Sequence, residues 1–206
     1  MSKLKTLSKT SRRNYLTYGV VILAYIILQA LNGSLSSSLK GMLVPICAYV
    51  VMAVSLNLTV GVLGELSLGH AGFMSMGAFT GTAAAMALQD SIPSAPLRLA
   101  VAMVIGAVFA AIAGVLIGIP VLRLNGDYLA IVTLAFGEIV RNVFKNLPWF
   151  GGAKGFSTTV YDPSSLYIVA FIMVLVVLFL TQNLIRSKHG RAVTAIRDNE
   201  IAAKAM

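Results

Sequence analysis

The sequence reads LYIVAFIMVLVVLFLTQNLI from Leu166 to Ile185, without one charged side chain. A helix rises about 1.5 Å per residue and the hydrocarbon core of a bilayer is about 30 Å thick, so about 20 apolar residues are needed to cross it. This stretch therefore has the length and the character of a membrane-spanning helix. It is the most hydrophobic part of the chain, and the rest of the fold is predicted outward from it.

Five further stretches share this character to different degrees, and together they set the fold class. They are residues 16–31, 39–62, 71–88, 97–119 and 128–147. Of all 206 residues, 58% are hydrophobic and only 11% are charged, with a mean hydropathy of +0.87. A soluble domain of this length cannot hide so much apolar surface in one core. The prediction is an all-α, polytopic transmembrane helical bundle of about six membrane segments.

Positive charge flanks the apolar stretches. The net charge is +9, and basic residues gather before residue 16 and after residue 185. Lys and Arg concentrate in cytoplasmic loops, so this placement indicates membrane orientation and not nucleic-acid binding. The first apolar stretch is expected to be an uncleaved helix, because residues 32–39 lack a clean signal-peptide cleavage pattern. The predicted domains are a basic cytoplasmic N-terminus (1–15), a transmembrane permease domain (16–185) and a cytoplasmic segment (186–206).

Residues 57–81 read NLTVGVLGELSLGHAGFMSMGAFTG, and glycine recurs throughout. Glycine disfavours a helix, and unpaired backbone groups are costly in hydrocarbon, so the third segment is predicted to be broken where it faces protein or water. Broken helices line solute pathways in transporters. Ser67, Gly69 and His70 are therefore candidate pathway residues. The alternatives are that 61–69 is an ordinary cytoplasmic turn and that His70 only satisfies a hydrogen bond.

The fifth segment contains Glu138 and Arg141, which share one face of the predicted helix. A charge at mid-bilayer costs roughly 2.5 to 3.5 kcal/mol on insertion scales, so it normally faces a partner or a wet cavity. We therefore interpret both as pathway residues that can pair with each other. The alternative is that this helix ends early and that Glu138–Lys145 lies at the outer surface.

The fourth segment carries small residues every four positions, which lines one helix face and predicts close helix packing. The packing is expected within this subunit, with a contact between subunits as the alternative. These residues include Gly106, Ala110, Gly114 and Gly118.

Enzyme chemistry has no visible basis in this sequence. It lacks a Walker A loop, a nucleophile elbow and a group of His, Cys and carboxylate residues at metal-ligand spacing. The single cysteine, Cys47, lies inside an apolar run and is interpreted as packing. We expect no catalytic residues, no metal and no cofactor.

Three passages together resemble the LivM-type permease subunit of the branched-chain amino acid ABC importer family. They are LNLTVGVLGELSLGHAGFMSMGAFTG, RLNGDYLAIVTLAFGEIVRNVFKN and SKHGRAVTAIRDNEIAAKAM. The resemblance extends from about Met42 to the end of the chain. Family members continue beyond the position of Met206, so the sequence is expected to be part of a longer protein.

This resemblance implies a multi-pass subunit of a bacterial or archaeal plasma (inner) membrane. It would pair with a homologous permease subunit, sit on two cytoplasmic ATPase subunits that hydrolyse ATP, and receive solute from an extracytoplasmic solute-binding protein. The resemblance also implies a cytoplasmic coupling loop that touches an ATPase. Its matching residues are Gly190, Arg191, Ala192, Arg197, Glu200, Ala202 and Ala203.

Other functions remain open from the residues alone. The solute could be urea or a short amide instead of a branched-chain amino acid. An ion-coupled secondary transporter or channel is favoured by the charges at Glu138 and Arg141, but the coupling-loop-like tail argues against it. A structural membrane scaffold would have no evident use for a broken third segment.

Overall fold

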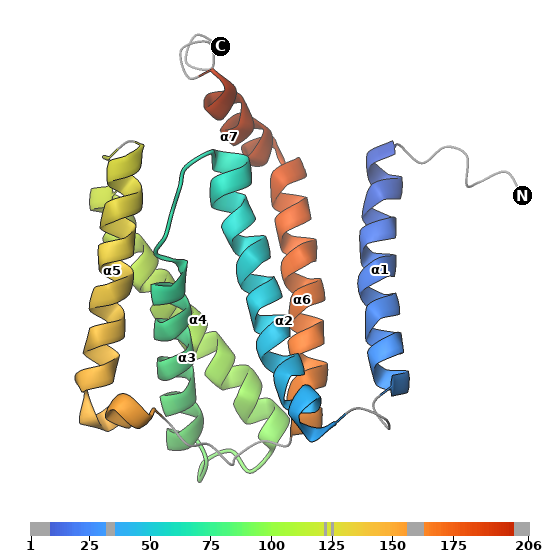
Figure 1. The fold of residues 1–206 in the computed structure, drawn as a ribbon, viewed down its shortest axis with the longest axis vertical. Helices are drawn as coiled ribbons and strands as arrows, with labels where there is room; N and C mark the ends of the chain where they lie inside the picture. Colours follow the sequence, from blue (N-terminus) through green and yellow to red (C-terminus); the bar gives the residue numbers. More distant parts are fainter. Residues whose placement is uncertain (1–8, 32–35, 122, 125, 156–162, 200–206) are drawn as a thin grey trace, which may run out of the picture.

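The computed structural model describes residues 9–31, 36–121, 123–124, 126–155 and 163–199. Each of the six predicted stretches forms a helix, and the described residues include no strand, which confirms the all-α class (Figure 1). The long helices are α1 (Lys9–Leu31), α2 (Ser37–Asn57), α3 (His70–Ala87), α4 (Ala95–Val121), α5 (Asp127–Asn146) and α6 (Pro163–Arg186). The shorter elements are η1 (Leu58–Leu63), η2 (Pro148–Phe150), η3 (Gly152–Lys154) and α7 (Lys188–Asp198).

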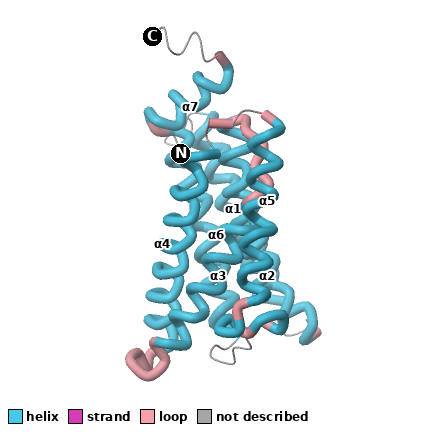
Figure 2. The backbone as a smooth tube through the Cα atoms, turned by 90° about the vertical axis from the view of Figure 1, so that its left-hand side faces the viewer, coloured by secondary structure: helices cyan, strands magenta, loops and turns pink. Residues whose placement is uncertain are grey.

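Most of the long helices lie roughly along one axis, whereas α4 is tilted across them, and successive helices run in opposite directions (Figure 1). Figure 2 shows the same elongated bundle from the side. Three helical runs are long and apolar enough to cross a bilayer by themselves: Ser38–Leu63, Ala95–Val121 and Leu166–Arg186. A shorter apolar run covers Leu16–Ala30. The beginning of α1 and the whole of α7 lie at the same end of the bundle, as six crossings require. We call this the α7 end.

The helices pack as two groups. In one group α2 lies against α6, and α1 joins α6 through Tyr25, whose ring centroid is 4.7 Å from that of Phe171 and 5.7 Å from that of Tyr167. In the other group α3 packs against α4 and α5. Contact between the two groups is light, with α2 against α3 as its clearest pair, and a cavity lies between them.

Close packing of α3 on α4 uses the small face of α4. A Cβ atom built on Gly106 would lie 3.3 Å from the Cα atom of Gly81, and a Cβ built on Gly77 would lie 3.7 Å from the Cβ of Ala110. Farther along, a Cβ on Gly114 would reach only the ring of Phe73, at 3.9 Å, and one on Gly118 would meet no described atom within 4 Å. The small face of α4 therefore packs against α3 from Gly106 to Ala110, whereas no described atom lies against Gly118.

The break in the third segment is shorter than its glycine content suggests. Backbone from Gly64 to Gly69 is not helical, but α3 then runs without interruption from His70 to Ala87. Gly64 turns the chain with a φ of 84°, a left-handed conformation that favours glycine. The connection, which we call the linker (64–69), descends from the α7 end, so that α3 begins well inside the bundle (Figure 1).

The fifth segment does not end early. Helix α5 continues through Lys145 to Asn146, and only then does the chain turn into η2 at Pro148. The alternative that this helix ends early is therefore wrong, whereas the placement of Glu138–Lys145 at the outer surface stays a prediction. Glu138 and Arg141 both lie within a continuous helix.

Candidate functional site

The linker is fixed to α5 deep inside the bundle. The backbone N–H of Leu68 donates to Thr133 Oγ1 at 3.0 Å, and the same hydroxyl donates to the carbonyl oxygen of Ala130 at 3.0 Å. Thr133 is buried, so this hydroxyl satisfies a backbone group that has no helical partner. A Cβ on Gly69 would lie 2.8 Å from the carbonyl oxygen of Thr133. Only glycine therefore lets the head of α3 approach α5 this closely.

Thr133 was not predicted from the sequence. The signal that points to it is a hydroxyl within the otherwise apolar run 129–137 of α5, opposite a linker whose backbone needs partners. Single hydroxyls are common in membrane helices, where they often bond within their own helix. The long-range partner could be found only with the fold in hand.

A cavity of about 610 Å³ lies between the two helix groups and reaches the head of α3. Its walls are almost entirely apolar, and its polar side chains are His70 and Ser55. The Nδ1 atom of His70 is buried and has no hydrogen-bond partner in the described part of the chain. His70 therefore carries an unused hydrogen-bonding atom at the edge of an apolar cavity. Representative lining residues are Cys47 and Val51 from α2, Phe73 from α3, Ala110 from α4 and Met173 from α6.

Glu138 and Arg141 bind each other and not the head of α3. Arg141 Nη1 lies 3.2 Å from Glu138 Oε2, and the two side chains are 68% and 55% exposed for Arg141 and Glu138 respectively. Neither lines the cavity at His70. The five predicted pathway residues thus divide into one group at the linker and α3 and a second, the exposed ion pair farther along α5.

Helix α7 is set at its angle to α6 by Ser187 and Gly190. Ser187 Oγ donates to the carbonyl oxygen of Leu184 at 2.7 Å and accepts from the N–H of Gly190 at 3.1 Å, which caps the helix. Gly190 is buried, and a Cβ there would lie 2.6 Å from the carbonyl oxygen of Ile185. Arg191 and Ala192 follow on the exposed side. The predicted coupling segment is therefore a helix with a fixed start.

Arg197 ties α7 to the turn before the linker. Its Nη1 donates to the carbonyl oxygen of Gly61 at 2.7 Å, and its Nη2 lies 2.8 Å from Asp198 Oδ1. A Cβ on Gly64 would lie 2.8 Å from Arg197 Cγ, so the turn and the side chain fit closely. We call this arrangement the Arg197 contact. The other predicted coupling residues, Glu200, Ala202 and Ala203, lie outside the described residues.

Comparison with known proteins gives concordant matches. A family model described as the permease component of branched-chain amino acid transport systems matches residues 38–206. The chain is 38% identical over 191 residues to the high-affinity branched-chain amino acid transport system permease protein LivM of Escherichia coli K12, covering 77% of this chain and 43% of that protein. It is 29% identical over 197 residues to the probable branched-chain amino acid transport permease protein LivM of Methanocaldococcus jannaschii, covering 76% of this chain and 56% of that protein.

The chain thus spans about half the length of these curated relatives. No solved structure matches it significantly. The matched region contains every described helix from α2 to α7, and so includes the linker, the cavity at His70 and the Arg197 contact.

Proposed function

The chain belongs to the family of permease components of branched-chain amino acid transport systems, and on this basis we propose that it is a membrane-spanning permease subunit of an ABC importer for branched-chain or related amino acids. The observation that carries this proposal is the family match over 38–206, which takes in both the membrane helices and α7. In this role the chain forms part of a solute pathway, and ATP is hydrolysed by separate subunits.

The partners follow from this role. They are a homologous permease subunit, two cytoplasmic ATPase subunits and an extracytoplasmic solute-binding protein. The Glu138–Arg141 pair supports the homologous permease subunit as a partner, because an exposed ion pair on a membrane helix needs protein or water against it, not lipid. Helix α7 supports the ATPase subunits as partners, because its start is fixed to α6 while Arg191 and Ala192 stay exposed for contact.

The cavity at His70 is the proposed pathway within this subunit. Its apolar walls suit an aliphatic side chain, since burial of apolar surface stabilises binding. The polar end of a solute is met by His70 Nδ1 and by the amino end of α3, whose first-turn N–H groups and positive dipole end favour a carboxylate. Gly69 and Ser67 stand just before that helix end, where Gly69 lets the head of α3 approach Thr133 of α5.

Uptake measurements test this function. The complete transporter, with its partner subunits and binding protein, is expressed in cells that lack their own branched-chain amino acid uptake, and entry of labelled leucine is followed. We expect uptake that requires active ATPase subunits. His70→Ala should lower it about tenfold, in line with loss of a buried hydrogen bond, while His189→Ala, an exposed residue of α7, should leave it unchanged.

Other outcomes of that experiment favour the alternatives. Leucine uptake that persists with inactive ATPases and depends on an ion gradient would indicate a secondary carrier, for which the Glu138–Arg141 pair is the supporting feature. Entry of urea or a short amide in place of leucine would keep the permease role and change its substrate.

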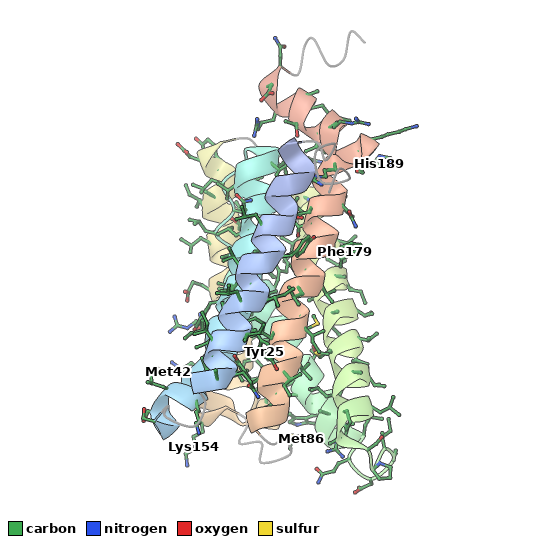
Figure 3. All side chains as sticks on the ribbon, turned by 90° about the vertical axis from the view of Figure 1, so that its right-hand side faces the viewer. Tyr25, Met42, Met86, Lys154, Phe179 and His189 are labelled. Carbon is green, nitrogen blue, oxygen red and sulfur yellow. The ribbon has the colours of Figure 1, made fainter. Side chains whose placement is uncertain are left out.

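We also propose that the N-terminus and α7 are cytoplasmic, and cysteine labelling tests this orientation. Trp149 is 90% exposed and lies beyond α5, at the end opposite α7. Figure 3 shows His189 at the α7 end and Lys154 at the opposite one. With an impermeant maleimide, Trp149→Cys should react in intact cells and His189→Cys only after permeabilisation. The native Cys47 is buried and serves as the unreactive background. The reverse labelling pattern would contradict the orientation.

A further inference from the structure

A second cavity, of about 260 Å³, lies at the end opposite α7 and shares no residue with the cavity at His70. It is formed where α3 and α5 meet the loop that follows α5. We call it the cationic pocket. Its lining residues are Ser75, Phe79, Arg141, Phe144, Lys145, Gly152, Lys154 and Gly155.

The floor of the cationic pocket is built from stacked aromatic rings. Phe79 of α3 stacks on Phe144 of α5 with ring centroids 4.7 Å apart, and Phe150 of the loop meets Phe144 edge-on at 4.9 Å. Such pairs add stability beyond their buried area. The loop is therefore held onto both helices, and the pocket exists before any ligand arrives.

The loop that forms its rim closes tightly on itself. Gly151 has a φ of 77°, and a Cβ there would lie 2.7 Å from the carbonyl carbon of Gly155, so Gly151 does not accept a larger residue without a shift of the loop. The N–H of Gly155 donates to the carbonyl oxygen of Gly152 at 3.2 Å. This closed loop carries Lys154 and fixes its backbone beside α5.

The charge of the pocket has one sign. Arg141, Lys145 and Lys154 line it, and no carboxylate is among its lining residues. Arg141 is engaged by Glu138, but within the described residues neither lysine forms an ion pair. Two exposed lysines from different elements thus line a space with an aromatic floor, and their positive charge favours an anion there.

We propose that the cationic pocket binds the carboxylate of a small solute with an apolar side chain, at the mouth opposite α7. Lys145 and Lys154 would form charge-assisted hydrogen bonds to the carboxylate, while the apolar part rests on Phe79 and Phe144. Ser75 Oγ donates to the carbonyl oxygen of Ala71 at 2.9 Å, so its lone pairs stay free to accept from a ligand's ammonium group.

The size of the pocket agrees with such a ligand. Its volume lies below the roughly 300–1,000 Å³ typical of sites for drug-sized molecules, so it suits something as small as a single amino acid. That the natural ligand is an amino acid, arriving from the binding protein, rests on the proposed function. Recognition of the carboxylate rests on the pocket alone.

The test measures binding to the purified, assembled transporter without its binding protein, by saturation-transfer NMR. The probes are L-leucine, 4-methylpentanoate, which has the carboxylate and branched chain but no amino group, and leucinamide, which has no carboxylate. We expect leucine and 4-methylpentanoate to bind and leucinamide not to. Lys145→Gln and Lys154→Gln should each weaken binding about tenfold. Lys40→Gln is the matched control, because it removes an exposed lysine near the start of α2, at the same end but outside the pocket.

Each result decides a separate point. Binding of both carboxylates that is insensitive to the two lysines overturns the proposal, as does equal binding of leucinamide. If the variants leave probe binding intact but weaken association with the binding protein, the pocket receives an acidic group of that protein and the solute site is rejected. If the wild-type transporter fails to import leucine yet binds 4-methylpentanoate through Lys145 and Lys154, the proposed function fails and the carboxylate site stands.

Discussion

Replacing Gly106 with leucine is expected to remove most of the folded subunit from the membrane fraction. A Cβ at this position would lie 3.3 Å from both the carbonyl carbon of Gly77 and the Cα atom of Gly81, so the backbone of α3 itself is the obstacle. A backbone cannot rotate away as a side chain can. Overpacking a close contact costs about 1–3 kcal/mol, and a leucine adds further atoms beyond Cβ.

In a lipid bilayer, the cost of overpacking α3 against α4 is large relative to the stability of the helix pair. Between membrane helices no hydrophobic effect drives association, so close packing of small residues supplies much of the stability. Displacing α3 from α4 would also disturb the head of α3, where His70 and Gly69 lie. The yield of monodisperse protein in detergent chromatography and its thermal denaturation midpoint are the measurements.

Gly118→Leu provides the control for Gly106→Leu. It makes the same chemical change on the same face of the same helix, but a Cβ there meets no described atom within 4 Å. We expect this variant to accumulate at a normal level. If both variants behave like the wild type, the close approach of α3 and α4 is not important to the fold. If only Gly118→Leu fails, the open half of this face packs on another subunit.

The sequence was sufficient to predict the helices, because each depends on a local property. An apolar run of the right length must be helical in hydrocarbon, so α2, α4 and α6 follow from composition and length. The same reasoning located the break near Gly64–Gly69. It overestimated its extent, because glycines in α3 were taken as helix breakers, whereas Gly77 and Gly81 provide contact with α4.

Features that depend on distant residues were not predictable. The bond from Leu68 to Thr133 joins residues 65 positions apart, and the bond from Arg197 to Gly61 joins residues 136 apart. No local pattern encodes such pairs. The cationic pocket is another example, since Lys145 and Lys154 line one pocket only because the loop folds back on α5.

Helix α7 also depends on a contact that the sequence does not reveal. It runs from Lys188 to Asp198, and Ser187 caps its first turn. Gly190 lies inside this first turn, where the absence of a side chain permits contact with the carbonyl of Ile185.

The Arg197 contact joins the proposed ATPase-facing helix to the proposed pathway along a continuous line. Helix α7 holds the Gly61 carbonyl, Gly61 lies in η1, and η1 leads through the linker to the head of α3 at His70. Movement of α7 would therefore pull on the linker and reach the cavity. A link of this kind transmits only as much free energy as the contact itself contributes.

Arg197→Ala is expected to lower solute uptake about fivefold while the ATPase subunits still co-purify with the permease. The hydrogen bond from Arg197 to Gly61 is partly exposed, so its loss should cost about 1 kcal/mol, which corresponds to that factor. Gly64→Ala should produce the same defect from the other side, because its Cβ would lie 2.8 Å from Arg197 Cγ and its φ is positive. Lys188→Ala, exposed on the same helix, is the matched control.

The double variant of Arg197→Ala and Gly64→Ala shows whether the two substitutions disrupt one shared contact or two independent ones. If Arg197 and Gly64 act through one contact, the double variant should be no worse than the stronger single variant, because a contact can be lost only once. Additive losses would mean that each residue has a separate role. Loss of the ATPase subunits from Arg197→Ala preparations would place Arg197 in the intersubunit surface instead, and uptake equal to the wild type would show that α7 does not act on the pathway through Gly61.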